Sequence, residues 1–273
     1  MSEYAHPLEI QLERIEREAW ADLAAIIPPP LAQGIGLQFG PLGGAFLFLA
    51  SHVPQYQFNW LSGAGLNEDD GRSIAEAVKR FRDAGQQRFF IQIPPGPRVS
   101  DCIAQARAAG LKPHPLAWAK FYRGTADPPV VTTDLEVREV GARETALFAD
   151  TAVAGFGMPP SMATWLAQIV GRPHWHAYVT LVGGEPASAA AMYVLDDFAW
   201  LGIGASRPEM RRRGGQRALL ARRIADAAKF GAKHATTETG VPQPGLPAPS
   251  YSNILKSGFS VAYVRPNWTE IDP

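Results

Sequence analysis

The sequence has little of what would indicate a metal-bound, strongly charged or membrane-bound protein. Cys102 is its only cysteine, which excludes an intramolecular disulfide and a cysteine-based metal cluster. Its 26 lysines and arginines equal its 26 aspartates and glutamates, so overall charge favours neither nucleic acid nor an anionic membrane as a partner. It has no run of 18 apolar residues, and its acidic N-terminus lacks an apolar core, so we expect no membrane span and no signal peptide. The cytoplasm is therefore the expected compartment.

Two halves of the 273-residue chain repeat the same order of predicted elements. In the first half a helix ends at Gly85 and another at Gly110, each followed by a strand. In the second half the matching helices end at Gly231 and Gly258. Both halves close with an aromatic and basic strand, AWAKFYR in the first and VAYVRPNW in the second. The order and spacing predict an internal repeat of a mixed α/β unit.

The composition between the repeats predicts a domain boundary. TADPPVVTTD, residues 125–134, has the prolines and small polar residues of a loop. We therefore predict an N-terminal domain over residues 1–126, which begins with an amphipathic helix over 7–26, and a C-terminal domain over residues 132–273.

Positive charge gathers at one point of this neutral chain, where Arg211, Arg212 and Arg213 precede Gly214 and Gly215 at the start of a predicted helix. The first amides of a helix lack intrahelical partners, and the helix dipole places partial positive charge there. Adjacent glycines let a phosphate approach the backbone closely. The spacing differs from a P-loop, because no Gly-Lys-Ser/Thr follows, and from the Rossmann fingerprint, because Gly-x-Gly-x-x-Gly is absent here. The stretch therefore predicts an anion site of another kind.

This stretch resembles the acetyl-CoA loop of the GCN5-related N-acetyltransferase (GNAT) superfamily, whose motif is Gln/Arg-x-x-Gly-x-Gly/Ala. Gln216 departs from the motif, because Gly or Ala is usual at that position. The resemblance continues to the C-terminus, where a short helix carries Asn253 and ends in Gly258-Phe259. It implies an α/β fold of two GNAT-like domains, each a mixed, mostly antiparallel sheet flanked by helices.

The resemblance also implies where acetyl-CoA binds as cosubstrate. Only the C-terminal half is expected to bind it, because the acidic Glu68, Asp69 and Asp70 stand at the loop position of the degenerate N-terminal half. The implied CoA-binding residues are those of the preceding strand, the loop and the later helix: Gly204, Ala205, Ser206, Arg211, Arg212, Arg213, Gly214, Gly215, Gln216 and Asn253.

Acetyl transfer to an amine needs a group that takes up a proton and a group that protonates the departing thiolate. Glu238, near the end of the strand KHATTET, is our candidate base; it is equally suited to bind a cationic substrate or to hold a loop. Many relatives carry a tyrosine as the acid, but here that position is Ile254. Tyr251, one turn earlier, and water are the alternatives.

The sequence therefore predicts an acetyl-CoA-dependent N-acetyltransferase whose acceptor is a small-molecule amine. We expect no metal, because no cysteine or carboxylate completes a site around His174 and His176, and no nucleic-acid or membrane partner. Two other readings remain open. One is a non-catalytic acyl-CoA sensor or scaffold, and the other is an enzyme similar to the aminoacyl-tRNA-dependent peptidyltransferases. The sequence does not indicate an oligomeric state.

Overall fold

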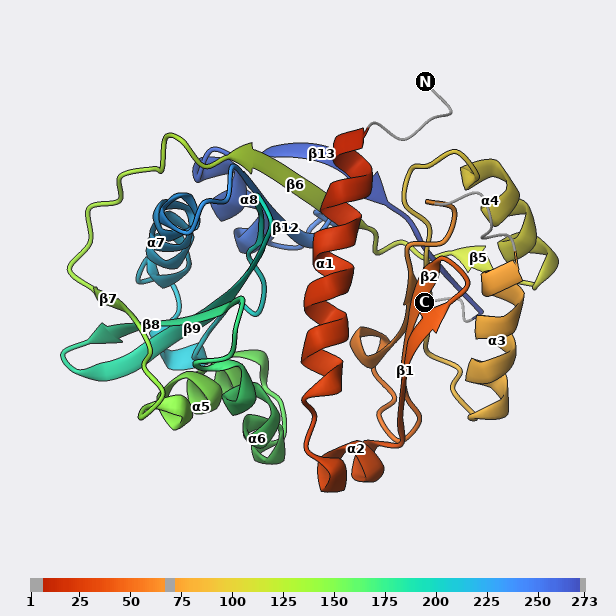
Figure 1. Cartoon of the computed structure of the whole chain (residues 1–273), viewed down its shortest axis with the longest axis horizontal. Coiled ribbons are helices and arrows are strands. Elements are labelled where there is room, and N and C mark those ends of the chain that lie inside the picture. The colour runs from red at the N-terminus through yellow and green to blue at the C-terminus, as the bar shows by residue number, and fades with distance from the viewer. Residues whose placement is uncertain (1–6, 67–71, 271–273) are drawn as a thin grey trace.

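The computed structural model describes residues 7–66 and 72–270, and the structural statements below concern these residues. Glu68, Asp69 and Asp70, expected to keep CoA out of the N-terminal half, lie outside them. Figure 1 shows a long helix, α1 (Pro7–Ala25), standing between two lobes that each contain a β-sheet with helices against it.

The structure contains the helices predicted before Gly85, Gly110, Gly231 and Gly258, together with shorter elements that were not predicted. The first half contains α1, α2 (Pro29–Ile35), β1 (Leu37–Leu42), β2 (Ala45–Ala50), β3 (Asn59–Ser62), α3 (Ser73–Asp83), β4 (Phe90–Gln92), α4 (Val99–Ala108), β5 (Lys112–Pro113) and β6 (Trp118–Gly124). The second half contains β7 (Glu136–Glu139), α5 (Thr145–Phe156), α6 (Ala163–Leu166), β8 (Trp175–Val182), β9 (Glu185–Leu195), β10 (Phe198–Trp200), β11 (Ala205–Ser206), α7 (Gly215–Lys229), β12 (His234–Gly240), α8 (Pro249–Lys256), β13 (Ser260–Arg265) and β14 (Asn267–Thr269). Within the described ranges, no helix has both the length and the apolar character that crossing a membrane requires.

The strands form two sheets that are antiparallel except for two parallel pairs. The first sheet has the order β1-β2-β3-β4-β14-β5, and the second has β13-β6-β12-β10-β9-β8-β7, with β11 paired to β9. The parallel pairs are β3 with β4 and β10 with β12, at the same place in each sheet. The predicted fold of two mixed, mostly antiparallel sheets flanked by helices is confirmed.

The two halves exchange their closing strands. β6 follows the first half in sequence but lies between β12 and β13 of the second sheet. β14 does the reverse and lies between β4 and β5 of the first sheet. The last stretch, which we expected to be one strand, is therefore two strands in different sheets, separated by Pro266. Division of the chain at residues 126–132 consequently separates β6 from the sheet in which it pairs.

An aromatic cluster around α1 lies between the sheets. The ring of Trp20 on α1 lies 5.5 Å from that of Trp60 on β3 and 6.2 Å from that of Trp200 on β10. The buried face of α1 also carries Leu12 and Ile15. One apolar cluster thus includes side chains of both halves, so burial of α1 stabilises them together.

Candidate active site

β10 and β12 run side by side and then separate, which opens a slot in the second sheet. Their pairing ends at Trp200 opposite Thr236, and the last backbone bond runs from Leu201 N–H to the Thr236 carbonyl at 2.8 Å. Ile203 has a φ of 50°, a rare conformation for a β-branched residue, and the chain then turns to pair with β9. The apolar run over residues 198–206, FAWLGIGAS, has the pattern of one continuous strand, but the strand is broken at residues 201–204.

This break exposes backbone donors to the slot. In the described part of the chain, the amides of Ile203 and Gly204 have no hydrogen-bond partner. The two residues after them, Ala205 and Ser206, pair with β9. Unpartnered amides beside a cavity are suited to bind a ligand carbonyl or amide.

Two glycines bring the N-terminus of α7 close to the end of this slot. Gly214 is the N-cap with a left-handed φ of 83°, and a Cβ there would meet nothing within 4 Å. Gly215 is buried, and a Cβ there would lie 2.2 Å from Ser188 Oγ on β9. Glycine is therefore needed at Gly214 for its conformation and at Gly215 for close packing of the helix on the sheet.

The three arginines before α7 are exposed. Arg211 Nη2 donates to the Gly155 carbonyl at 3.3 Å, which ties the loop to α5. No ion pair to Arg212 or Arg213 is found among the described residues. Their positive charge is available to an anion at the helix N-terminus.

Gln216, the residue that departs from the motif, reaches from α7 to α8. Its Oε1 accepts a hydrogen bond of 2.8 Å from Asn253 Nδ2. Gln216 also lines the cavity at the slot. The two predicted CoA-binding side chains therefore bind each other across the gap between the helices.

One cavity of about 430 Å³ runs from the slot into the cleft between the halves. It brings together Gly204, Gln216 and Glu238 of the predicted residues, and Ile254 also lines it. Tyr251 is not among its lining residues. The Tyr251 ring packs edge-on against Phe121, with 5.0 Å between the ring centroids.

Glu238 lies where the slot opens into the cleft, with 15% of its side chain exposed. It accepts hydrogen bonds of 3.0 and 3.1 Å from Trp200 Nε1 and lies 3.1 Å from Lys120 Nζ. Burial and the negative charge of Glu16 raise the pKa of Glu238, although Lys120 opposes the shift. A carboxylate whose pKa is raised toward neutrality is suited to accept a proton.

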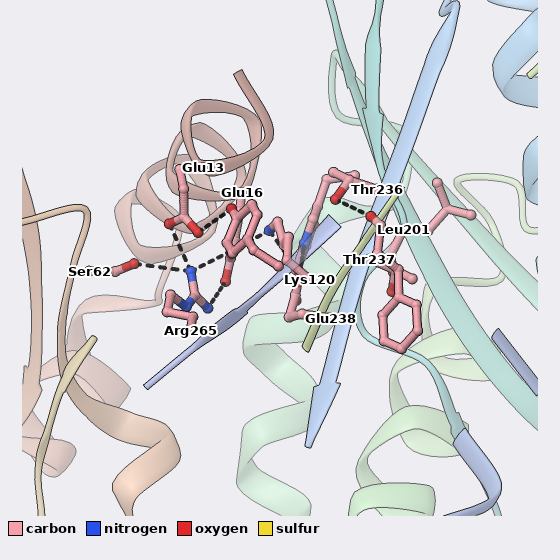
Figure 2. A network of polar contacts seen from close by, with 12 residues as sticks. Glu13, Glu16, Ser62, Lys120, Leu201, Thr236, Thr237, Glu238 and Arg265 are labelled. Atoms are coloured by element: carbon pink, nitrogen blue, oxygen red, sulfur yellow. Dashed lines mark hydrogen bonds and ion pairs between the residues drawn. The ribbon is translucent and has the colours of Figure 1, made fainter. Parts of the chain in front are cut away.

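A buried network of charges continues from Glu238 to α1 (Figure 2). Lys120 Nζ donates to Glu16 at 2.5 Å, and Arg265 donates to Glu16 at 2.9 and 3.0 Å and to Glu13 at 2.8 Å. Burial alone would raise the pKa of Glu16, but Arg265 and Lys120 lower it to about 2. Glu16 is thus held ionised by two cations.

This network was not predicted from the sequence. The sequence features that point to it are single charged residues in otherwise apolar patterns. Lys120 stands within AWAKFYR, and Glu16 stands on the apolar face of the first helix. A buried lysine or arginine needs a partner, but the sequence does not identify that partner.

Arg223 on α7 is a third buried cation and lies beside the slot. Its Nη1 donates to the carbonyls of Ala191 at 2.7 Å and Gly202 at 3.1 Å, and its Nε donates to Leu219 at 3.2 Å. Burial lowers its pKa to about 10. The Gly202 carbonyl belongs to the break in the strand, so Arg223 holds the backbone that shapes the slot.

His174 and His176 have separate partners. His176 Nδ1 lies 2.8 Å from Glu139 Oε1, and His174 Nδ1 lies 2.9 Å from the Val194 carbonyl oxygen. In the ranges that the structure describes, no three His, Cys, Asp or Glu side chains are grouped as metal ligands would be.

No family model matches the sequence, and no curated protein matches it. Solved structures match the fold. A GCN5-related N-acetyltransferase from Sphaerobacter thermophilus aligns with a TM-score of 0.62 over 99% of this chain and 96% of its own, at 14% identity. A GCN5-related N-acetyltransferase from Kribbella flavida gives 0.58 over 93% and 95%, at 14% identity. A tandem GNAT protein from the clavulanic acid biosynthesis pathway gives 0.58 over 98% and 96%, at 16% identity. These likenesses span both halves, and the chain therefore has the tandem GNAT fold.

Proposed function

We propose that the chain is an acetyl-CoA-dependent N-acetyltransferase that acetylates a small-molecule amine, with its CoA site in the C-terminal half. The observation that carries the proposal is the cavity that joins the slot between β10 and β12 to Glu238. The glycine-rich N-terminus of α7 follows the strand that is broken at residues 201–204. The proposed site for the pyrophosphate is therefore next to the proposed site for the acetyl group.

The residues around the slot fit acetyl-CoA in three respects. The N-cap Gly214 leaves open space before the first amides of α7, which suits a pyrophosphate. Arg212 and Arg213 add cationic donors there. The amides of Ile203 and Gly204 are available to the carbonyl groups of an acylated pantetheine arm.

Acetyl-CoA supplies the thioester, and the reaction replaces its C–S bond with the C–N bond of an amide. Glu238 takes the first proton from the ammonium group of the acceptor, which frees the nitrogen lone pair for attack. The amides of Ile203 and Gly204 are the donors available to the carbonyl oxygen as it gains negative charge. The nitrogen loses a second proton on becoming an amide, and the sulfur takes up one. The proton that Glu238 accepted is released to solvent, so the protons balance.

The source of the proton for sulfur is either Tyr251 or water. We favour water, because Ile254 lines the cavity and Tyr251 packs on Phe121. Tyr251→Phe separates the two possibilities. A turnover number within twofold of wild type supports water, and a fall of tenfold or more supports the tyrosine.

The test of the proposed function is release of free thiol from acetyl-CoA in the presence of a panel of amines. We expect thiol release that depends on the amine and matches the amount of acetylated product. Saturable acetyl-CoA binding without turnover on any amine would instead support a sensor.

A further inference from the structure

Tryptophans form the wall of the cavity where it enters the cleft between the halves. They come from α1, β3, β6, α6 and β10, so both halves contribute: Trp20, Trp60, Trp118, Trp165 and Trp200. Tyr56 and Phe90, stacked with 4.2 Å between ring centroids, extend this aromatic wall. A surface of this kind binds flat apolar groups.

Most of these tryptophans have their N–H groups bound within the protein. Trp60 and Trp165 donate to backbone carbonyls at 3.2 and 2.7 Å, and Trp200 donates to a carboxylate. Their rings are therefore fixed. Trp60, Trp165 and Trp200 are buried, so the partly exposed Trp20 and Trp118 offer most of the aromatic surface to a ligand. Trp118 Nε1 is buried and has no partner in the described structure.

The charged groups that face one another beside this wall do not balance. The network contains three carboxylates and two cations: Glu13, Glu16, Glu238, Lys120 and Arg265. Glu13 and Glu16 each bind Arg265. Within residues 7–66 and 72–270, the one ionic partner of Glu238 is Lys120, which it shares with Glu16. Glu238 is also the carboxylate whose side chain is most exposed to the cavity, at 15% against 9% for Glu16. One more positive charge beside Glu238 would balance the three carboxylates of the network.

Arg223 does not supply that charge. It lies on α7 at the slot, and its hydrogen bonds go to the carbonyls of Ala191, Gly202 and Leu219. Among the described residues, the charge of Glu238 is therefore left to be balanced by a proton or by a cationic ligand.

We propose that the acceptor is a monoamine with a flat apolar, aromatic body, held with its ammonium group beside Glu238 and its body against the cleft tryptophans. This inference rests on the proposed function and narrows its substrate class. A polycation is a poor fit, because Glu16, the other carboxylate that lines the cavity, already binds Lys120 and Arg265, and the wall beyond is largely aromatic. A neutral molecule of the same shape leaves the carboxylate uncompensated.

The experiment measures direct binding of three probes to the full chain without acetyl-CoA, using tryptophan fluorescence. The probes are 2-phenylethylamine, its neutral counterpart 2-phenylethanol, and spermidine. We expect saturable binding of 2-phenylethylamine and at least tenfold weaker binding of the other two. Equal binding of the amine and the alcohol, tighter binding of spermidine, or no saturable change with the amine would overturn the proposal.

Two variants and a control locate the contacts. Glu238→Gln should bring the affinities for the amine and the alcohol to within twofold of each other, while the alcohol still binds. Trp118→Leu should weaken the binding of both probes at least fivefold. It breaks no hydrogen bond, because Trp118 Nε1 has no partner among the described residues. Glu185→Gln, at the exposed first residue of β9, should change neither affinity. Unchanged discrimination in Glu238→Gln contradicts the placement of the ammonium group.

A separate calorimetric titration with acetyl-CoA keeps the two proposals apart. Binding of acetyl-CoA without binding of the amine rejects only the substrate class. Binding of the amine without binding of acetyl-CoA rejects only the acetyltransferase proposal.

Discussion

Lys120 Nζ lies 3.1 Å from Glu238 Oε2, although 118 residues separate the two in sequence. The residues stand directly opposite each other on β6 and β12, so their side chains share one face of the sheet. Lys120 reaches this place because β6 crosses from the first half into the second sheet. The N-terminal half thus contributes a cation to the candidate active site as well as a wall of the cleft.

Glu238→Gln tests the role of that carboxylate in catalysis. The amide cannot take a proton from the acceptor, so we expect kcat/KM to fall by about 100-fold or more, which is typical for loss of a general base. Acetyl-CoA affinity should remain within twofold, because the proposed pyrophosphate site is at the N-terminus of α7 and Glu238 is on β12. Steady-state kinetics measure kcat/KM, and calorimetry measures the affinity for acetyl-CoA.

The pH profile of the same variant gives an independent readout. Burial raises the pKa of Glu238, so wild-type kcat/KM should rise with pH through an apparent pKa above the ordinary 4.5. That acidic limb should disappear in Glu238→Gln and persist in the exposed control Glu185→Gln. A limb that persists in Glu238→Gln assigns the titrating base elsewhere.

Glu16→Gln tests the buried network through stability. Glu16 binds Lys120 and Arg265, and its loss leaves both cations with fewer partners. We expect the free energy of unfolding at pH 7 to fall by about 3 kcal/mol, the usual scale for breaking a buried ion pair. Urea unfolding of Glu16→Gln and of the same-helix control Glu18→Gln measures this, and the control should change little.

The contribution of Glu16 should depend on pH in one direction. Its pKa is about 2 in the folded chain and 4.5 when unperturbed, so the unfolded state binds a proton first as pH falls. The stabilisation is complete above pH 4.5 and is lost between there and pH 2. The gap between wild type and Glu16→Gln should narrow over that window, and a constant gap would show that the carboxylate acts through packing alone.

Local features of the fold could be predicted from the sequence, and the strand exchange could not. Gly214 and Gly215 mark the start of α7 because that geometry is dictated by neighbouring residues. The closing strands AWAKFYR and VAYVRPNW look alike, so order alone cannot say which sheet each one joins. The pairing of these strands with the second sheet brings Lys120 and Arg265 to the site. This pairing depends on contacts between residues far apart in sequence, and no spacing motif predicts it. The break at residues 201–204 lies within an apolar run whose pattern predicts a continuous strand.

The bond between Gln216 and Asn253 gives a pair of opposite predictions. Gln216→Ala removes a side chain from the slot and frees the Asn253 amide, so we expect severalfold tighter binding of acetyl-CoA. Asn253→Ala removes a donor from the same place and should weaken binding severalfold. Titration of both variants checks the pair. Equal changes in both would mean that the two residues only join α7 to α8.

The most direct test of the account is calorimetric titration of acetyl-CoA into the wild type, Gly214→Glu and Gly214→Ala. Both substitutions place a side chain at a φ of 83°, so they share the same backbone strain, but only glutamate adds a negative charge where the pyrophosphate should lie. We predict one-to-one binding to the wild type, retained binding to Gly214→Ala and complete loss in Gly214→Glu. Absence of binding to the wild type, or equal affinity of the three proteins, would contradict the CoA site at α7 and with it the proposed acetyltransferase.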